Sequence, residues 1–301
     1  QPSLTNAIHE LEKEMGINIF NRSNKGISPS IEGEVFLGYA RQVLEQAKVL
    51  EDKYKGDDGG KKSFCVSTQH YSFAVNAFVD LIKRYGQDEY DFSIRETQTY
   101  EIIDDVARMR SEIGILFMND FNEKVLNKIL RANDLEFHEL FVAKPHVFIS
   151  RKHPLAKNDI IINEELEAYP YLSFEQGEHN SFYFSEEIFS TTERKKNIRV
   201  RDRATLFNLL IGLNGYTVCS GVIDEKLNGK DIISVPLADE SDMRIGYIVH
   251  RKAILSRLGN TYLGALANYL TAGSDEPEDS VKIPQRKLQH RGRFNEMRDD
   301  G

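Results

Sequence analysis

The sequence predicts an α/β protein of at least two domains, preceded by helical segments. Its 301 residues are long for one compact domain. Hydrophobic residues make up 40% of the chain and charged residues 29%, which is typical of globular proteins. From residue 63 onward, short β-type runs alternate with amphipathic helical runs, and this alternation predicts a mainly parallel sheet.

The first element is an amphipathic helix. Its apolar positions are spaced by 4, 3, 4 and 4 residues (Leu4, Ile8, Leu11, Met15 and Ile19), and the helix is predicted to end near Gly16. The turn-rich residues 21–30 follow and contain Arg22 and Lys25, so we predict a hairpin or wing that ends in a helix-capping signal.

A long second helix is predicted from Glu32. Its apolar residues are spaced alternately by 4 and 3, as in a coiled-coil seam: Phe36, Ala40, Val43, Ala47, Leu50 and Tyr54. This spacing favours dimerisation, while an ordinary core helix of one domain is the alternative. The charged, glycine-rich residues 55–62 contain no apolar side chain and mark a domain boundary.

Beyond this boundary the elements are predicted in turn. The strands are residues 63–68, 90–96, 113–117, two within 135–150 separated at Lys144-Pro145, 198–203, 215–220 and 243–250. The helices are residues 71–85, 102–110, 205–213 and 255–269. Residues 273–301 hold few apolar side chains and are predicted to be a disordered tail.

Several classes of function are disfavoured. A net charge of -8 argues against a surface that binds nucleic acid everywhere, although a local DNA-reading element is compatible with it. Cys65 and Cys219 lie far apart and none of the 8 histidines forms a close pair, so we expect no disulfide, no metal and a cytoplasmic location. Nucleotide-binding and hydrolase motifs are absent, and we expect neither catalytic residues nor a cofactor.

The ends of the chain and its apolar runs also carry expectations. The start, Gln1-Pro2-Ser3, has no export signal, and we expect the chain to begin inside a longer protein. The longest uncharged stretch, residues 204–223, is too polar for a membrane span.

The N-terminal 22 residues resemble a known pattern. QPSLTNAIHELEKEMGINIFNR closely resembles the recognition helix and wing of LysR-type transcriptional regulators, although the helices that open the family's helix-turn-helix are not present before Gln1. The resemblance extends through the long helix to Tyr54, through His153-Pro154-Leu155-Ala156, and as far as Ala272.

This resemblance implies a domain organisation. Residues 1–31 would be a partial winged helix-turn-helix and residues 32–60 a linker helix with a hinge. Residues 61–272 would be a two-lobed, periplasmic-binding-protein-like effector domain, and the tail follows. The lobes would be joined by two crossing strands, near residues 141–147 and 242–249, with a small effector bound between them.

The predicted DNA contacts lie in the first helix and the wing. A helix that enters the major groove offers short polar side chains from its first turn, while loop cations contact the phosphates. We therefore predict contacts by Gln1, Pro2, Ser3, Thr5, Asn6, Arg22 and Lys25. For Arg22 and Lys25 the alternative is that they are solvated loop cations.

The predicted effector contacts lie at strand ends, where the family binds its ligands: Ser67, Thr68, Gln69, Thr97, Thr99 and Arg201. Alternatively, Ser67 and Thr68 only cap the following helix. Arg199, Arg201 and Arg203 alternate along one strand, which favours an anionic effector, although such alternation is also typical of a solvated face.

The sequence thus predicts a LysR-type regulator. It would bind double-stranded DNA as a homodimer or homotetramer, and an effector would change lobe closure and so the spacing of the DNA-reading helices. A solute-binding protein without DNA binding is the main alternative, because the same two-lobed fold serves that function too. A soluble α/β enzyme is a third.

Overall fold

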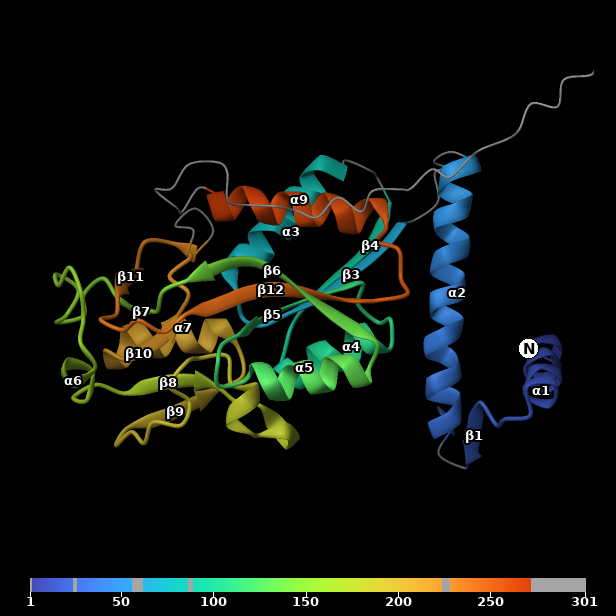
Figure 1. Cartoon of the computed structure of the whole chain (residues 1–301), viewed down its shortest axis with the longest axis horizontal. Coiled ribbons are helices and arrows are strands. Elements are labelled where there is room, and N and C mark those ends of the chain that lie inside the picture. Colours follow the sequence, from blue (N-terminus) through green and yellow to red (C-terminus); the bar gives the residue numbers. More distant parts are fainter. Residues whose placement is uncertain (1, 24–25, 56–61, 86–88, 224–227, 272–301) are drawn as a thin grey trace, which may run out of the picture.

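A computed structural model describes residues 2–23, 26–55, 62–85, 89–223 and 228–271. A first helix, a hairpin and a long second helix form the N-terminal part, and two α/β lobes form the rest. Figure 1 shows the long helix α2 standing beside the first lobe, with α1 on the far side of α2. Gln1, Lys25, the hinge at residues 56–60 and the tail at 273–301 lie outside the described residues.

The first helix and the hairpin form as predicted. Helix α1 spans Pro2–Met15 and ends at Gly16, whose φ of +68° is a left-handed conformation that favours glycine after a helix. Strand β1 (Phe20–Ser23) pairs antiparallel with β2 (Gly26–Pro29). The Glu12 carboxylate accepts hydrogen bonds from the backbone N–H groups of Ile19 (2.8 Å) and Phe20 (3.1 Å), which fixes the hairpin against α1.

Helix α2 spans Ile31–Lys55 and begins at the predicted cap. The Ser30 hydroxyl accepts a hydrogen bond from the Gly33 N–H at 2.8 Å, which satisfies a free donor of the first turn. A Cβ on Gly33 would lie 1.8 Å from the Ile19 carbonyl oxygen, so only glycine allows the helix to approach the hairpin this closely.

The first lobe contains a five-stranded sheet in the order β4-β3-β5-β12-β6. Its strands are β3 (Lys62–Thr68), β4 (Tyr90–Glu96), β5 (Ile113–Met118), β6 (Leu135–Ala143) and β12 (Met243–His250). Strand β3 is parallel to β4 and β5, whereas β12 is antiparallel to β5 and β6. Figure 1 shows α3 (Ser72–Tyr85) and α9 (Arg257–Thr271) on one face, with α4 (Thr99–Ala107) and α5 (Glu123–Ala132) on the other.

The second lobe contains a five-stranded sheet in the order β11-β7-β10-β8-β9. Its strands are β7 (His146–Ser150), β8 (Tyr171–Phe174), β9 (Asn197–Val200), β10 (Tyr216–Cys219) and β11 (Ile232–Pro236). Helix α7 (Arg203–Leu213), the short α6 (Asn163–Leu166) and two 3-10 turns, η1 (Gly177–His179) and η2 (Phe182–Phe184), complete it. The sequence did not predict α5, α6, β8 or β11.

The chain crosses between the lobes twice. The first crossing, at Lys144-Pro145 between β6 and β7, lies where it was predicted. The second lies at residues 237–242 and meets the predicted range of 242–249 only at its first residue, because β12 pairs along its whole length with strands of the first lobe. One hydrophobic cluster runs from Phe64 and Phe73 of the first lobe to Val147 and Tyr216 of the second, so the two lobes share a core.

Candidate functional site

The candidate site is the junction where the two lobes meet. The C-terminal ends of the parallel strands β3, β4 and β5 face the second lobe there, as is usual for ligand sites in open α/β sheets. The junction has two parts with different character. In one part, polar side chains of the two lobes bind each other, and in the other a cavity remains between them.

Gln69 occupies the centre of the first part. Its side-chain amide donates to the Thr99 hydroxyl at 2.6 Å, and its amide oxygen accepts from the Phe117 N–H at 3.0 Å and the Tyr71 hydroxyl at 3.2 Å. Gln69 and Thr99 are both buried, so these bonds join the ends of neighbouring strands in a low-dielectric setting. In this arrangement both ends of the Gln69 side-chain amide are hydrogen-bonded to protein groups.

Ser67 and Thr68 are buried as well. The Ser67 hydroxyl donates to the Asp105 carboxylate at 2.6 Å, and the Thr68 hydroxyl donates to the Gln69 carbonyl at 2.8 Å. Thr97 is bonded to the side chain of Glu101 one turn further along. These predicted effector contacts are therefore brought to one place, with their polar groups bonded to protein.

His70 and Glu186 connect the lobes through a buried ion pair. Nδ1 of His70 lies 2.9 Å from Oε2 of Glu186, and their side chains are only 3% and 5% exposed. Nε2 of His70 lies 3.1 Å from the Arg201 carbonyl, so both ring nitrogens face acceptors and the doubly protonated ring fits. Burial is the largest single influence and opposes the charge on His70, but the Glu186 carboxylate together with Glu96 and the Arg201 carbonyl outweighs it, so the pKa of His70 is raised.

Further bonds cross the junction beside this pair. The Thr99 N–H donates to the Gln176 side chain at 3.1 Å, and the Thr99 hydroxyl donates to the Phe184 carbonyl at 2.7 Å. Arg203 pairs with Glu96 at 3.0 Å, while burial raises the pKa of Glu96 against the opposing charge of Arg203. We call this part of the junction the sealed half, defined by Ser67–His70 and Glu96–Thr99 of the first lobe with Gln176, Phe184, Glu186 and Arg203 of the second.

Arg201 lies at the edge of the sealed half. Its side chain is 81% exposed and pairs with Glu175, a residue of its own lobe. Of the three alternating arginines, Arg203 thus reaches across the junction, whereas Arg201 lies largely in solvent.

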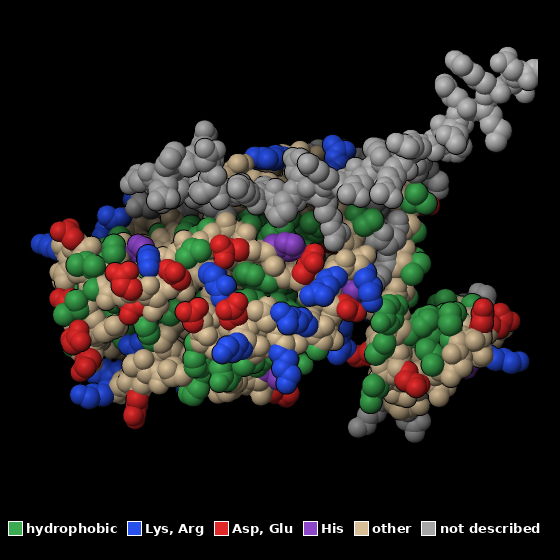
Figure 2. All heavy atoms as spheres, viewed as in Figure 1, with side chains coloured by type: hydrophobic (Ala, Val, Ile, Leu, Met, Phe, Trp, Pro, Cys, Tyr) green, Lys and Arg blue, Asp and Glu red, His purple; other side chains and the backbone are tan. Residues whose placement is uncertain are grey.

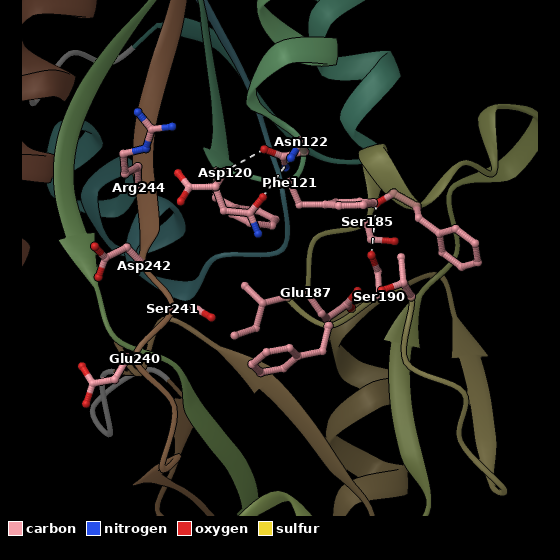
Figure 3. A pocket seen from close by; sticks show the side chains of 16 residues that line it. Asp120, Phe121, Asn122, Ser185, Glu187, Ser190, Glu240, Ser241, Asp242 and Arg244 are labelled. Atoms are coloured by element: carbon pink, nitrogen blue, oxygen red, sulfur yellow. Dashed lines mark hydrogen bonds between the residues drawn. The ribbon is translucent and has the colours of Figure 1, made fainter.

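The other part of the junction holds a cavity of about 520 Å³, which we call the open half. Three segments line it: the end of β5 with the following loop, residues 182–191 of the second lobe, and the second crossing with the start of β12. Figure 3 shows Asp120, Glu187 and Ser241, one from each segment, around the same space.

Glu187 is the buried acid of the open half. Its Oε1 accepts from the Phe174 N–H at 2.8 Å, and burial followed by the charge of Glu186 raises its pKa to about 8. The Glu187 carboxyl group is therefore mainly protonated at neutral pH. A perturbed acid in a cavity is typical of functional sites.

The residues of the open half were not predicted from the sequence. A polar signal was present in Asn119-Asp120-Phe121-Asn122, which follows directly after the buried strand β5. The two asparagines brace each other, because each side-chain oxygen accepts the backbone N–H of the other (2.9 and 3.0 Å). Residues 182–191 and 240–244 carry no comparable signal in the sequence. They line the cavity only because the tertiary structure brings them there.

The predicted DNA contacts lie on α1 and the hairpin. Pro2, Ser3, Thr5 and Asn6 belong to the first turns of α1, and the Asn6 side chain is exposed. Arg22 is exposed on β1. Gln1 and Lys25 fall outside the described residues, and of Pro2 and Ser3 only the backbone is described.

The predicted dimerisation residues lie on α2. Val43 is 67% exposed and Leu50 is 59% exposed, Ala47 is exposed, and Phe36 and Ala40 are half-buried. Tyr54 lies within the helix, but its side chain is not described. Figure 2 shows hydrophobic side chains gathered over the region of α1 and α2. A run of exposed apolar side chains of this kind marks an interaction surface.

Metal ligation and membrane insertion find no support among the described residues. No three of the described His, Cys, Asp and Glu side chains are grouped so as to hold a metal ion. Within the same residues, no helix is long and apolar enough to cross a membrane. Burial raises the pKa of both Cys65 and Cys219, which keeps these thiols protonated.

Comparisons with known proteins agree with this architecture. Residues 64–271 match the family described as LysR substrate binding domain. The chain is 23% identical over 293 residues to the uncharacterized HTH-type transcriptional regulator YbhD of Escherichia coli (strain K12), covering 95% of this chain and 88% of YbhD. It is 26% identical over 179 residues to YnfL of the same strain, covering 58% of this chain and 57% of YnfL.

Solved structures share the fold. A full-length OxyR variant from Pseudomonas aeruginosa superposes with a TM-score of 0.62 at 18% identity, covering 88% of each chain. CbnR, a LysR family transcriptional regulator, gives a TM-score of 0.51 at 14% identity, covering 89% of each chain. At these identities the likeness concerns the fold.

Proposed function

Because this chain belongs to the LysR family, whose substrate binding domain covers residues 64–271, we propose that it acts as a LysR-type transcriptional regulator controlled by a small effector between the lobes. One observation carries the proposal: a helix and a hairpin stand at one end of the 25-residue helix α2, which lies against a two-lobed domain. The solute-binding alternative is not favoured, because that function has no use for this N-terminal part and the relatives are named as transcriptional regulators.

DNA binding is assigned to α1 and the hairpin. The first turns of α1 offer the polar residues Thr5 and Asn6, which suit base edges in the major groove. Arg22 on the hairpin suits the phosphate backbone. Gln1, Pro2, Ser3 and Lys25 complete the proposed contact set.

Self-association is assigned to α2. The exposed side chains of Val43, Ala47 and Leu50 recur at coiled-coil spacing and would be buried against α2 of a second copy. A homodimer, or a homotetramer built from two such dimers, would present two copies of α1 to two DNA half-sites.

Helix α4 provides a route from the junction to α2. At its start, Thr99 is bonded to Gln176 and Phe184 of the second lobe. At its end, Arg108 pairs with Glu34 of α2, and Arg41 of α2 donates to the Arg108 carbonyl at 3.1 Å. A movement of the second lobe would therefore act on α2 through one rigid helix.

The proposed function also includes a location, the absence of catalysis and a set of effector contacts. We propose a cytoplasmic protein without a catalytic residue, and we assign no cofactor. Effector contacts by Ser67, Thr68, Gln69, Thr97, Thr99 and Arg201 stay a prediction, since the buried members of this set would contact a ligand only if the sealed half opened.

The direct test is DNA binding by the full chain. DNA fragments would be selected from a random pool and then compared in a shift assay with Arg22→Ala, Asn6→Ala and the control Lys83→Ala, which removes a cation from α3. We expect Arg22→Ala to weaken binding to all DNA sequences alike. It should also reduce the slope of log affinity against log salt concentration by about 1. Asn6→Ala should lose about 1–3 kcal/mol of discrimination between sequences.

Selection of no sequence, or equal effects of the Arg22 variant and the Lys83 control, would contradict the assignment to α1 and the hairpin. Self-association is tested in the same preparation by sedimentation. Val43→Glu should shift the chain toward monomer, whereas Ile160→Glu, at an exposed position of the second lobe, should not.

A further inference from the structure

The open half has a chemistry that the predicted effector contacts did not suggest. Its cavity is bounded by both lobes and by the second crossing, so a molecule inside it would touch all the parts whose relative position changes when the lobes move. Ligand pockets of this size are usually largely preformed and occur between domains.

Acidic side chains dominate the charged groups of the cavity. The lining includes three carboxylates, from Asp120, Glu240 and Asp242, and one cation, Arg244. The fourth carboxyl group, that of Glu187, is mainly protonated at neutral pH. Arg244 is already paired, because its Nη2 lies 2.8 Å from Oε2 of Glu123. The single cation of the lining therefore already has a carboxylate beside it, which offsets its charge.

The acids differ in whether they form ion pairs with cationic side chains. Asp242 and Glu240 share Lys144, at 3.0 and 3.5 Å. Asp120 is exposed, and no described residue forms an ion pair with it. Glu187 is buried and has its Oε1 bound to the Phe174 N–H. Asp120 and Glu187 come from opposite lobes, and Figure 3 shows both beside the cavity.

Aromatic side chains supply much of the apolar part of the wall, beside the hydroxyl and amide groups that also line it. Phe117 and Phe121 come from the first lobe and Phe182 and Phe189 from the second. Phe121 stacks across the junction on Tyr183, with ring centroids 4.8 Å apart. Aromatic faces attract cations as well as apolar groups, and the attraction grows where water is excluded.

We propose that this cavity is the effector site and that its ligand is an organic cation, an amine or quaternary ammonium group on an apolar body. The cation would lie between Asp120 and Glu187, and the apolar body would contact the phenylalanines. This inference rests on the proposed function, because it places the effector of the regulator in the open half of the junction. It also predicts a positively charged effector, whereas Arg201 had suggested a negatively charged one. An anion would find the hydroxyl and amide donors of the lining, but it would also be repelled by Asp120, Glu240 and Asp242, and the one guanidinium there already has a carboxylate beside it.

The test uses three probes with the same skeleton and different charge: phenethylamine, phenylacetate and phenethyl alcohol. Calorimetric titration of the full chain should show that phenethylamine binds more tightly than the other two. Asp120→Asn should lower the affinity for phenethylamine by about tenfold or more, as expected for loss of a charged hydrogen bond. The matched control Asp159→Asn, an exposed carboxylate of the second lobe, should leave it unchanged.

Tighter binding of phenylacetate, absence of amine binding, or equal effects of Asp120→Asn and Asp159→Asn would each overturn the proposal. Competition by Mg²⁺ at equal concentration would also overturn it, since it would identify a site for bare cations. The regulator assignment fails separately: if phenethylamine binds as expected but the chain binds no DNA, the cation site holds and the proposed function does not. If phenylacetate alters a DNA complex instead, the function holds and the cation site does not.

Discussion

The two halves of the lobe junction show how one interface can serve two purposes. In the sealed half, buried polar groups of opposite lobes satisfy each other, and the side chains of His70 and Glu186 are almost entirely shielded from solvent. In the open half, exposed acids and aromatic rings surround an unfilled space. The difference indicates that the sealed half sets the energy of lobe closure, while the open half is available to a ligand without prior opening.

The largest expected effect comes from breaking the buried pair. His70→Ala leaves the Glu186 carboxylate buried without its partner, and we expect the free energy of unfolding to fall by about 3–5 kcal/mol. Urea denaturation followed by circular dichroism measures it. Asp242→Ala in the open half, which breaks only an exposed pair with Lys144, should cost less than about 1 kcal/mol.

A double variant sharpens this comparison. If His70→Ala and Glu186→Ala act through one another, the double variant should be less destabilised than the sum of the single variants. Additive effects, or equal losses for His70→Ala and Asp242→Ala, would show that the sealed half is no stronger than the open half.

The second effect is a decline of stability with rising pH. The pKa of Glu187 is about 8 in the folded chain against an ordinary 4.5, so between these values the unfolded state has released a proton that the folded state keeps. The raised pKa of His70 acts in the same direction, because its contribution is complete below 6.5 and is lost as pH rises through the folded value. The free energy of unfolding should therefore fall from about pH 5 to pH 8.

Glu187→Gln isolates the acid in this pH series, since it keeps the shape and removes the titration. The fall between pH 5 and pH 8 should become shallower in this variant. An unchanged slope would mean that Glu187 is ionised in the folded chain. The open half would then carry one more negative charge than it does with a protonated Glu187.

A smaller effect tests the route through α4. Glu34→Gln removes the partner that Arg108 has on α2 but leaves its pair with Asp104, and because the side chains are partly exposed the stability change should stay below about 1 kcal/mol. Hydrogen exchange at the amides of α2 should nevertheless rise, while the amides of α3 keep their protection. Unchanged exchange in α2 would indicate that Arg41 alone holds the helix against the lobe.

The smallest effect is expected at Arg201. Its side chain is mostly solvated, so Arg201→Ala should change the free energy of unfolding by no more than about 0.5 kcal/mol. If the effector lies in the open half, the variant should also bind phenethylamine as the parent chain does. A loss of binding comparable to that of Asp120→Asn would return the effector to the edge of the sealed half, as the sequence had predicted.

Much of the fold was accessible from the sequence, because its signals are local. The cap at Ser30, the left-handed Gly16 and the period of α2 depend on neighbours a few residues away. Strand β8 was missed because its four residues are too short to establish a period. Helix α5 was missed although Leu126, Ile129 and Leu130 carried a helical signal.

The junction could be predicted only in part. Strand ends such as Ser67–Gln69 are visible in the sequence, but whether their polar groups face a ligand or the protein depends on partners far along the chain. His70 and Glu186 are 116 residues apart, and no spacing rule connects them. The cavity likewise needs residues 117–122, 182–191 and 240–244 to meet, and they are far apart in the sequence.

The most direct test is to map phenethylamine on the chain by its effect on backbone amide NMR signals. We predict shifts that concentrate at residues 119–122, 185–191 and 240–244, with smaller shifts along α4. Shifts that concentrate instead at Ser67, Thr68, Gln69 and Arg201, or that leave the junction untouched, would contradict the division of the junction into a sealed half and a ligand-binding half.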